Sequence, residues 1–270
     1  MTTSLHQRAR GHLLVEVKHR DNITALADLR QEGCLKARFP RPVDWMEAVT
    51  LNSSGGVAGG DRVSTTIRVQ QGAQLTIAAQ AAERFYRALP QDPPSHVRTH
   101  IEIAPGASAE WLPQDSILFD RCALNRVLEV DIAATGWFLG LETLIFGRAA
   151  MGETVTTADL SDTIRIRHAG RLILHDAIRA HGPIADLLAQ TAIGAGAGAL
   201  ATIVMVAPDA AERLDGLRTA LTQVEAGAST WKNMLVARIA AKDGACIRAA
   251  IVAALVPLRD GRALPRVWNC

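Results

Sequence analysis

One pattern restricts the fold of this chain more than any other: stretches of alternating polar and apolar residues recur, each interrupted by a glycine turn. In residues 61–70, DRVSTTIRVQ, every second residue from Val63 to Val69 is Val, Thr or Ile, with Ser, Thr and Arg between them. Such alternation is typical of a strand with one buried face. The chain then turns at Gly72, and LTIAAQ (residues 75–80) resumes the alternation.

The same phrase returns further along the chain. It reads HVRTHIEIAPGASAEWL around Gly106, and looser versions surround Gly136 and Gly170. The turn glycines, from Gly72 onwards, are therefore 34, 30 and 34 residues apart. A strand–turn–strand unit with such a period suggests layers of β-structure, in which each hairpin-like unit covers the previous one. Regular turns of an unlayered all-β protein are the simpler alternative.

The last part of the chain differs from this pattern. Residues 193–207, IGAGAGALATIVMVA, suggest a glycine-rich segment that leads into another buried strand. Residues 207–225 carry apolar side chains at helical spacing, and Gly227 lies just past their end, as helix boundaries prefer. A second helix is predicted over residues 248–258. We therefore predict a mainly β fold of layered sheets, β-helix-like or stacked, with a small helical C-terminal portion.

Length and composition favour one domain. A chain of 270 residues suits a single large domain, so we predict one over residues 1–270, β-rich to about 207, helical at about 208–258 and ending in a tail. Hydrophobic residues make up 49% of the chain and aromatic residues only 4%, so small aliphatic side chains must form the core. The formal net charge of +2, without charge runs, argues against a nucleic-acid partner.

Other global features bear on location. The cysteines form no C-x-x-C pair, which argues against a disulfide framework and a closed zinc site. The N-terminal segment is basic but lacks the apolar run of a signal peptide. The longest apolar stretch, residues 199–207, is too short to cross a bilayer. We expect a cytoplasmic protein that does not bind membranes.

Residues 51–63, LNSSGGVAGGDRV, raise the question of a phosphate-binding loop. A P-loop needs a lysine and a hydroxyl residue after its last glycine, and then a helix. Here Asp61 and Arg62 follow Gly60, and a strand is predicted. We interpret the segment as a sharp turn, because glycine permits positive φ and Asp61 can cap the turn with its own side chain. The turn residues are Gly55, Gly56, Gly59, Gly60 and Asp61. A nucleotide-dependent enzyme that uses Gly55–Gly60 is an alternative.

No catalytic constellation is recognisable in the sequence. A G-x-S-x-G elbow is absent. His96 and His100 lie on the polar face of a predicted strand, where four residues span roughly 13 Å, so one metal ion cannot bind to both. We therefore expect a protein without enzymatic activity.

Acidic residues beside apolar or aromatic residues are the remaining polar signal. A carboxylate in such surroundings should be paired, metal-bound or in contact with water. An ion pair with an arginine is the simpler interpretation of each one. Together they suit a protein that handles a divalent cation weakly through oxygen ligands. The six are Glu83, Glu110, Asp115, Asp120, Glu142 and Glu153.

Five motifs in a fixed order resemble the family of the urease accessory protein UreD, also called UreH. They are NSSGGVAGGDR (52–62), AQAAERFYR (79–87), EWLPQDSILF (110–119), FGRAAMGE (146–153) and LPRVW (264–268). The resemblance implies a mainly β chaperone that is not an enzyme. It implies binding to urease apoprotein and to the accessory protein UreF, which in turn engages the GTPase UreG, so that nickel reaches the urease active site.

The resemblance also implies an internal path for nickel and no permanently bound cofactor. The six carboxylates named above are then candidates to line this path, because exchangeable oxygen ligands allow an ion to leave. Arg266 and Trp268 of the tail are candidate partner-binding residues for UreF, since exposed Trp and Arg are common binding anchors. Alternatively, Trp268 packs on its own domain. A general β-layered binding module without a metal role is the alternative to the whole interpretation.

Overall fold

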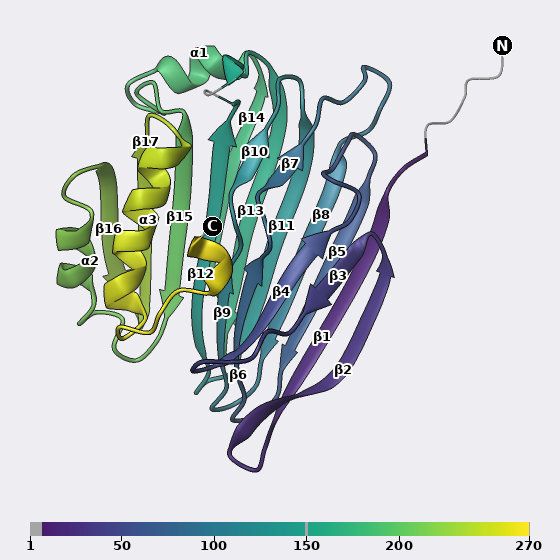
Figure 1. Ribbon diagram of the computed structural model, residues 1–270. Helices are drawn as coiled ribbons and strands as arrows, with labels where there is room; N and C mark the ends of the chain where they lie inside the picture. Colours follow the sequence, from purple (N-terminus) through teal and green to yellow (C-terminus); the bar gives the residue numbers. More distant parts are fainter. Residues whose placement is uncertain (1–6, 149–150, 270) are drawn as a thin grey trace.

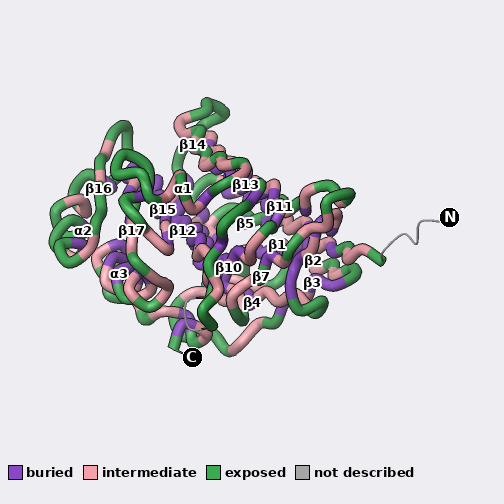
Figure 2. Tube along the Cα trace, turned by 90° about the horizontal axis from the view of Figure 1, so that it is seen from above, coloured by how far each residue is buried: buried purple, intermediate pink, exposed green. Residues whose placement is uncertain are grey.

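The computed structural model describes residues 7–148 and 151–269 and shows two β-sheets packed face to face (Figure 1, Figure 2). Sheet A has seven strands in the spatial order β14 (Arg171–Gly182), β13 (Ala158–His168), β11 (Ala123–Ile132), β8 (Ser95–Ile103), β5 (Arg62–Val69), β1 (Arg10–Arg20) and β2 (Ile23–Gly33). Sheet B has ten strands, of which eight follow the order β16 (Glu225–Trp231), β17 (Met234–Ala241), β15 (Ala199–Val206), β12 (Trp137–Phe146), β9 (Ser108–Leu112), β6 (Gln74–Ala79), β4 (Met46–Asn52) and β3 (Leu35–Arg38). The two short strands β10 (Ser116–Leu118) and β7 (Glu83–Phe85) continue from β12 beside this path.

The predicted mainly β, layered fold is confirmed, but three of the four repeated units are not hairpins. In the units around Gly72, Gly106 and Gly136, the first strand lies in sheet A and the second in sheet B. Strands β5, β8 and β11 are parallel neighbours, as are β6, β9 and β12. This arrangement lets the apolar faces of both strands meet across the core. Only β13 and β14, around Gly170, form an antiparallel hairpin.

The prediction of helix over residues 208–258 is right at both ends and wrong in the middle. Helices α2 (Leu214–Ala220) and α3 (Gly244–Leu258) form there, but the hairpin of β16 and β17 separates them. This hairpin turns at Lys232 and Asn233, whose φ values are +49° and +62°. The predicted buried strand after Gly194 is β15, and a short helix, α1 (Ile184–Ala189), lies outside the predicted helical portion.

The core consists of three apolar clusters. The first fills the space between the sheets, with Leu13 and Ile101 from sheet A against Phe138 from sheet B. The second lies on the outer face of sheet B, beneath α2 and α3, and includes Trp268. The third, with Phe85 and others, contains residues of both sheets near α1. The outer helices and the C-terminal segment are thus attached to sheet B.

Among the described residues, none of the helices has the length and apolar character needed to traverse a bilayer. Ala149 and Ala150, which belong to the motif at 146–153, lie outside the described residues, as does Cys270.

Candidate functional site

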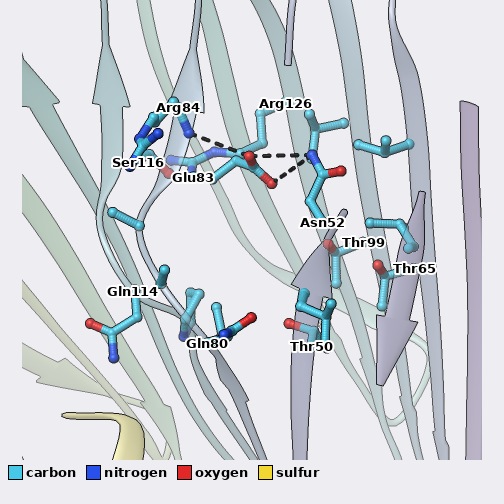
Figure 3. A pocket seen from close by; sticks show the side chains of 18 of the residues that line it. Thr50, Asn52, Thr65, Gln80, Glu83, Arg84, Thr99, Gln114, Ser116 and Arg126 are labelled. Atoms are coloured by element: carbon cyan, nitrogen blue, oxygen red, sulfur yellow. Dashed lines mark hydrogen bonds between the residues drawn. The ribbon is translucent and has the colours of Figure 1, made fainter. Parts of the chain in front are cut away.

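A polar cavity of about 260 Å³ lies between the two sheets (Figure 3). This volume has room for several water molecules, or for a hydrated ion. Its polar lining comes from both sheets and from the loops after β6 and β9. The polar residues that we assign to the cavity are Thr50, Asn52, Thr65, Gln80, Glu83, Arg84, Arg98, Thr99, Gln114, Ser116, Arg126 and Glu142. Val63 of the first apolar cluster and Phe85 of the third also line it, so the cavity borders both clusters.

The cavity exists because sheet A interrupts its apolar inner face. Each central strand of this sheet alternates in burial, and away from the strand ends its inward positions are otherwise Val, Leu or Ile. One polar residue replaces an apolar one in each strand. The replacements are Thr65 in β5, Thr99 in β8, Arg126 in β11 and Asp162 in β13.

Arg126 connects the two sheets inside the protein. Its Nε and Nη2 donate to the two carboxylate oxygens of Asp162 at 2.8 Å and 2.6 Å. Its Nη1 donates to Ser116 Oγ at 2.6 Å and lies 2.7 Å from Oε2 of Glu142, a residue of sheet B. All of these side chains are buried. A buried ion pair of this kind is costly to break, because removing one member leaves an uncompensated charge.

The side chain of Glu142 is therefore held in one position in the cavity wall. Its Oε1 accepts a hydrogen bond of 2.8 Å from Trp111 Nε1, and its Oε2 faces Arg126. Burial raises the pKa of this carboxyl, although the charge of Arg126 and the Trp111 hydrogen bond act in the opposite direction.

Glu83 differs from Glu142 because its principal side-chain partner is a neutral amide. Asn52 Nδ2 lies 3.3 Å and 3.2 Å from the two carboxylate oxygens of Glu83, as Figure 3 shows. The backbone N–H of Arg84 donates to Oε1 at 3.3 Å. Burial raises the pKa of Glu83, and the Asn52 hydrogen bonds offset part of this effect. The cavity thus contains one carboxylate that is paired with an arginine and one that is not.

The glycine segment holds Asn52 in place. The Oδ1 atom of Asn52 accepts hydrogen bonds from the N–H of Ser54 (3.0 Å) and from its hydroxyl (2.6 Å). Gly56 has φ of +143°, and a Cβ there would lie 2.4 Å from the ring of Tyr86, so only glycine fits. The hydroxyl of Tyr86 donates to the carbonyl of Gly55, which lines the cavity.

The other end of the segment is a turn that Asp61 organises. Its carboxylate accepts the backbone N–H groups of Ala9 and Ala58, both at 2.8 Å. Gly60 has φ of +82°, and Gly59 packs closely against Ala88. Strand β5 begins immediately afterwards, so no helix N-terminus points at the loop, as a phosphate-binding loop would require.

Glu110 lies away from the cavity, on the outer face of sheet B. Its two oxygens accept four hydrogen bonds: Thr76 (2.6 Å), two from Arg259 (2.9 Å each) and Arg262 (2.8 Å). Burial alone would raise the pKa of Glu110, but these hydrogen bonds and the charge of Arg259 hold it below its ordinary value. This carboxylate fixes the segment after α3 to the sheet.

The remaining three candidate carboxylates are also outside the cavity lining. Asp120 accepts hydrogen bonds from the backbone N–H groups of Thr156 and Thr157, and Glu153 pairs with Arg148 at 2.6 Å. Asp115 is half-buried, and burial raises its pKa, against the charge of Arg248. The structure therefore places Glu83 and Glu142 at the cavity and Glu110, Asp115, Asp120 and Glu153 elsewhere. Within residues 7–148 and 151–269, no three His, Cys, Asp or Glu side chains are grouped to hold a metal ion.

The tail residues lie in a 3-10 helix, η2 (Arg266–Asn269). Trp268 is only 4% exposed, and its Nε1 donates to the carbonyl of Leu112 at 3.1 Å. The guanidinium of Arg248 lies 5.1 Å from the centre of its ring. The arrangement is the alternative one, in which Trp268 packs on its own domain. Arg266 is exposed.

The sequence analysis did not identify Asn52 and Arg126 as cavity residues, nor Asp162 as the partner of Arg126. A signal was present for two of them: Arg126 and Asp162, which are cross-strand partners, each interrupt an alternating apolar series, as the partners Thr65 and Thr99 do in β5 and β8. Asn52 gave no comparable signal, because its orientation depends on the turn that follows it.

Comparisons with known proteins agree with the motifs. The profile of a family described as UreD urease accessory protein matches residues 9–269. A urease accessory protein UreD of Sinorhizobium medicae (strain WSM419) is 43% identical over 269 residues, covering 97% of this chain and 96% of the relative. One of Xanthobacter autotrophicus (strain ATCC BAA-1158 / Py2) is 40% identical, covering 98% and 91%. One of Methylobacterium sp. (strain 4-46) is 41% identical, covering 91% and 89%.

Proposed function

Since this chain belongs to the UreD family of urease accessory proteins, we propose that it is a chaperone that helps deliver nickel to the active site of urease, with the polar cavity as part of the path of the ion. Membership of the family implies a role in urease maturation, and the curated relatives are named as accessory proteins rather than enzymes. The partners that we propose are urease apoprotein and UreF, with UreG engaged through UreF.

One observation carries the proposal: an otherwise apolar space between two sheets contains a cavity lined by two carboxylates, by neutral oxygen ligands and by three arginines, of which Arg126 is already paired with Glu142 and Asp162. Carboxylate, amide and hydroxyl oxygens bind divalent cations and exchange readily, whereas thiolate and imidazole cages hold late transition metals tightly. A path needs ligands of the first kind, because an ion in transit must be released.

We assign different roles to the two carboxylates. Both carboxylate oxygens of Glu142 already have partners, Arg126 and Trp111. We therefore propose that Glu142 acts through its position in the cavity wall and its negative charge, and not as a direct ligand of the ion. Among the described residues, Glu83 accepts hydrogen bonds only from the amide of Asn52 and one backbone N–H, and the charge of Arg84 acts on it without an ion pair, so we infer that its carboxylate is available to a cation. A dication that approaches Glu83 favours the ionised carboxylate, and binding therefore releases a proton from any protonated fraction.

The role of the tail in docking UreF is a separate part of the proposal. Because Trp268 is buried, a contact by this segment would be made by Arg266 and neighbouring surface, with Trp268 fixing the position of the tail. The assignment of Arg266 as a partner-binding residue rests on its exposure beside a rigidly attached aromatic residue.

The proposed function is tested in a host that carries the urease operon with this gene deleted and then restored. We expect inactive, nickel-poor urease in the deletion strain, and recovery of both activity and nickel content on restoration. Fully active urease with normal nickel in the deletion strain would contradict a maturation role and favour a binding module without a metal function.

A further inference from the structure

We propose that a groove at one side of the sandwich, here called the hairpin groove, binds a segment of a partner protein in which carboxylates flank one large apolar side chain. The groove has a volume of about 400 Å³ and is distinct from the polar cavity, with which it shares no residue. The inference concerns the chemistry of the occupant, and the choice of probe proteins below rests on the proposed function.

Two hairpin turns from different sheets form the groove. One joins β13 to β14 at Ala169 and Gly170, and the other joins β16 to β17 at Lys232 and Asn233. Both central residues have positive φ in each turn: +48° and +76° in the first, +49° and +62° in the second. Two-residue turns of this type match the twist of their strands. The groove walls are therefore preorganised, which lowers the entropic cost of binding.

The walls of the groove are apolar and partly exposed. Leu172 is 52% exposed and Trp231 is 42% exposed, while the half-buried Ile173 and the buried Met234 complete the apolar lining. Large apolar side chains gathered at one exposed hollow indicate an interaction site more often than isolated ones do. Trp is also enriched among the residues that dominate binding energy. One large apolar side chain of a partner would fill this hollow.

The charges around the groove have one sign. Arg171 from one turn and Lys232 from the other lie at the groove, and none of its lining residues, all within the described ranges, is acidic. Neither cation forms an ion pair with any residue that the structure describes. Further along β14, Asp176 is paired with Arg238 of β17. Charge complementarity therefore selects an occupant with carboxylates on either side of its apolar residue.

Both β14 and β16 are terminal strands in the spatial order of their sheets, so the groove lies where the described part of the sandwich ends. A partner segment can approach it without displacing a strand. We favour a protein over a nucleic acid because only two cations are present and the wall opposite Trp231 consists of Leu172 and Ile173 rather than further aromatic residues.

The test compares variants of the full chain in binding to two purified probes, urease apoprotein and UreF. The groove variants are Arg171→Glu/Lys232→Glu, which reverses the charge at both turns, and Trp231→Ala, which removes the exposed ring. The control is Arg20→Glu/Arg41→Glu, which reverses the same number of exposed charges elsewhere. Melting curves establish that each variant is folded, and a single-stranded DNA oligonucleotide serves as a third probe.

We expect Kd for at least one protein probe to rise about tenfold or more in both groove variants and to stay within about twofold of wild type in the control. Unchanged Kd for both probes in the groove variants, or an equal loss in the control, would overturn the inference and leave the proposed function intact. Groove-dependent binding of the oligonucleotide alone would overturn it in favour of a nucleic acid. Failure of the wild-type chain to bind either protein would contradict the inference and the proposed partners together.

Discussion

Asn52 directs its side-chain amide at both carboxylate oxygens of Glu83, at 3.3 Å and 3.2 Å, and this contact joins the glycine turn to the polar cavity. The turn is therefore connected to the proposed path without binding a phosphate itself. The contact also explains why a carboxylate can lie at this depth: the amide compensates part of the cost of burial without neutralising the charge.

The half-buried Glu83 should reduce stability when it is ionised. Because burial raises its folded-state pKa above the ordinary 4.5, the unfolded chain ionises first as pH rises, and this group's contribution to stability declines above that pH. We expect Glu83→Gln to melt at the same temperature as wild type or higher at about pH 7.5. The difference should vanish as pH falls below 4.5. Thermal melts across this range check it, and a lower melting temperature of the variant at neutral pH would refute this assignment.

Removing Arg126 should destabilise the protein more than removing the charge of one of its partners, Glu142. Arg126→Met leaves the carboxylates of Glu142 and Asp162 buried without a counter-charge, so we expect a loss of about 3–5 kcal/mol in the free energy of unfolding. Glu142→Gln keeps a hydrogen-bonding group opposite Trp111 and leaves Arg126 paired with Asp162, so its loss should be about 1–2 kcal/mol. Denaturant unfolding measures both, and equal losses would contradict this description of the network.

The contact of Glu110 with Arg259 and Arg262 should stabilise the protein in a pH-dependent way. The pKa of Glu110 is held below its ordinary 4.5, so its contribution is present above that pH and is lost as pH falls through the folded-state value. We expect Glu110→Gln to cost about 3 kcal/mol at neutral pH, and less in acid. Glu153→Gln, at a partly exposed ion pair, is the control and should cost less than about 1 kcal/mol. Denaturant titrations at several pH values measure the free energy of unfolding of wild type and Glu110→Gln. A difference between the two that does not change with pH would contradict an origin in the ionised carboxylate of Glu110.

The tail offers a test that separates folding from docking. Trp268→Ala removes a buried ring and should cost about 3–5 kcal/mol of stability. Arg266→Glu reverses an exposed charge that acts on Glu47, so it should lower the melting temperature far less than Trp268→Ala does, while it weakens capture of UreF. If capture is normal in Arg266→Glu, the tail is structural and the docking assignment fails.

The layered β fold was predictable because the alternation of polar and apolar residues is a local property of the sequence. Strand pairing was not predictable, because it depends on residues far apart in the chain. The alternation in residues 61–70 indicates which side chains are buried. A glycine turn alone, however, does not indicate whether the next strand stays in the same sheet or crosses to the other. The hairpin at Lys232 was missed because Ala and Gly occupy much of β16, which weakens the alternation.

The positions of the candidate carboxylates were also only partly predictable from local sequence. Glu110 and Trp111 are adjacent in sequence, but successive residues of a strand point to opposite faces. Trp111 therefore lines the cavity, and Glu110 binds arginines on the outer face of sheet B. An apolar neighbour in sequence thus indicates burial of a carboxylate but not the face to which it belongs. Only the packing of the two sheets against each other brings Glu142 to Arg126.

The most direct test of the nickel path is the nickel content of urease purified from cells in which this gene carries Glu83→Gln, Glu142→Gln or the control Glu153→Gln. We expect well under half of the wild-type nickel in urease matured with Glu83→Gln, a smaller deficit with Glu142→Gln, and a normal content with Glu153→Gln. Capture of urease by each variant is measured alongside. Normal nickel loading in both cavity variants, with the complex intact, would contradict the assignment of the cavity to the path of the ion.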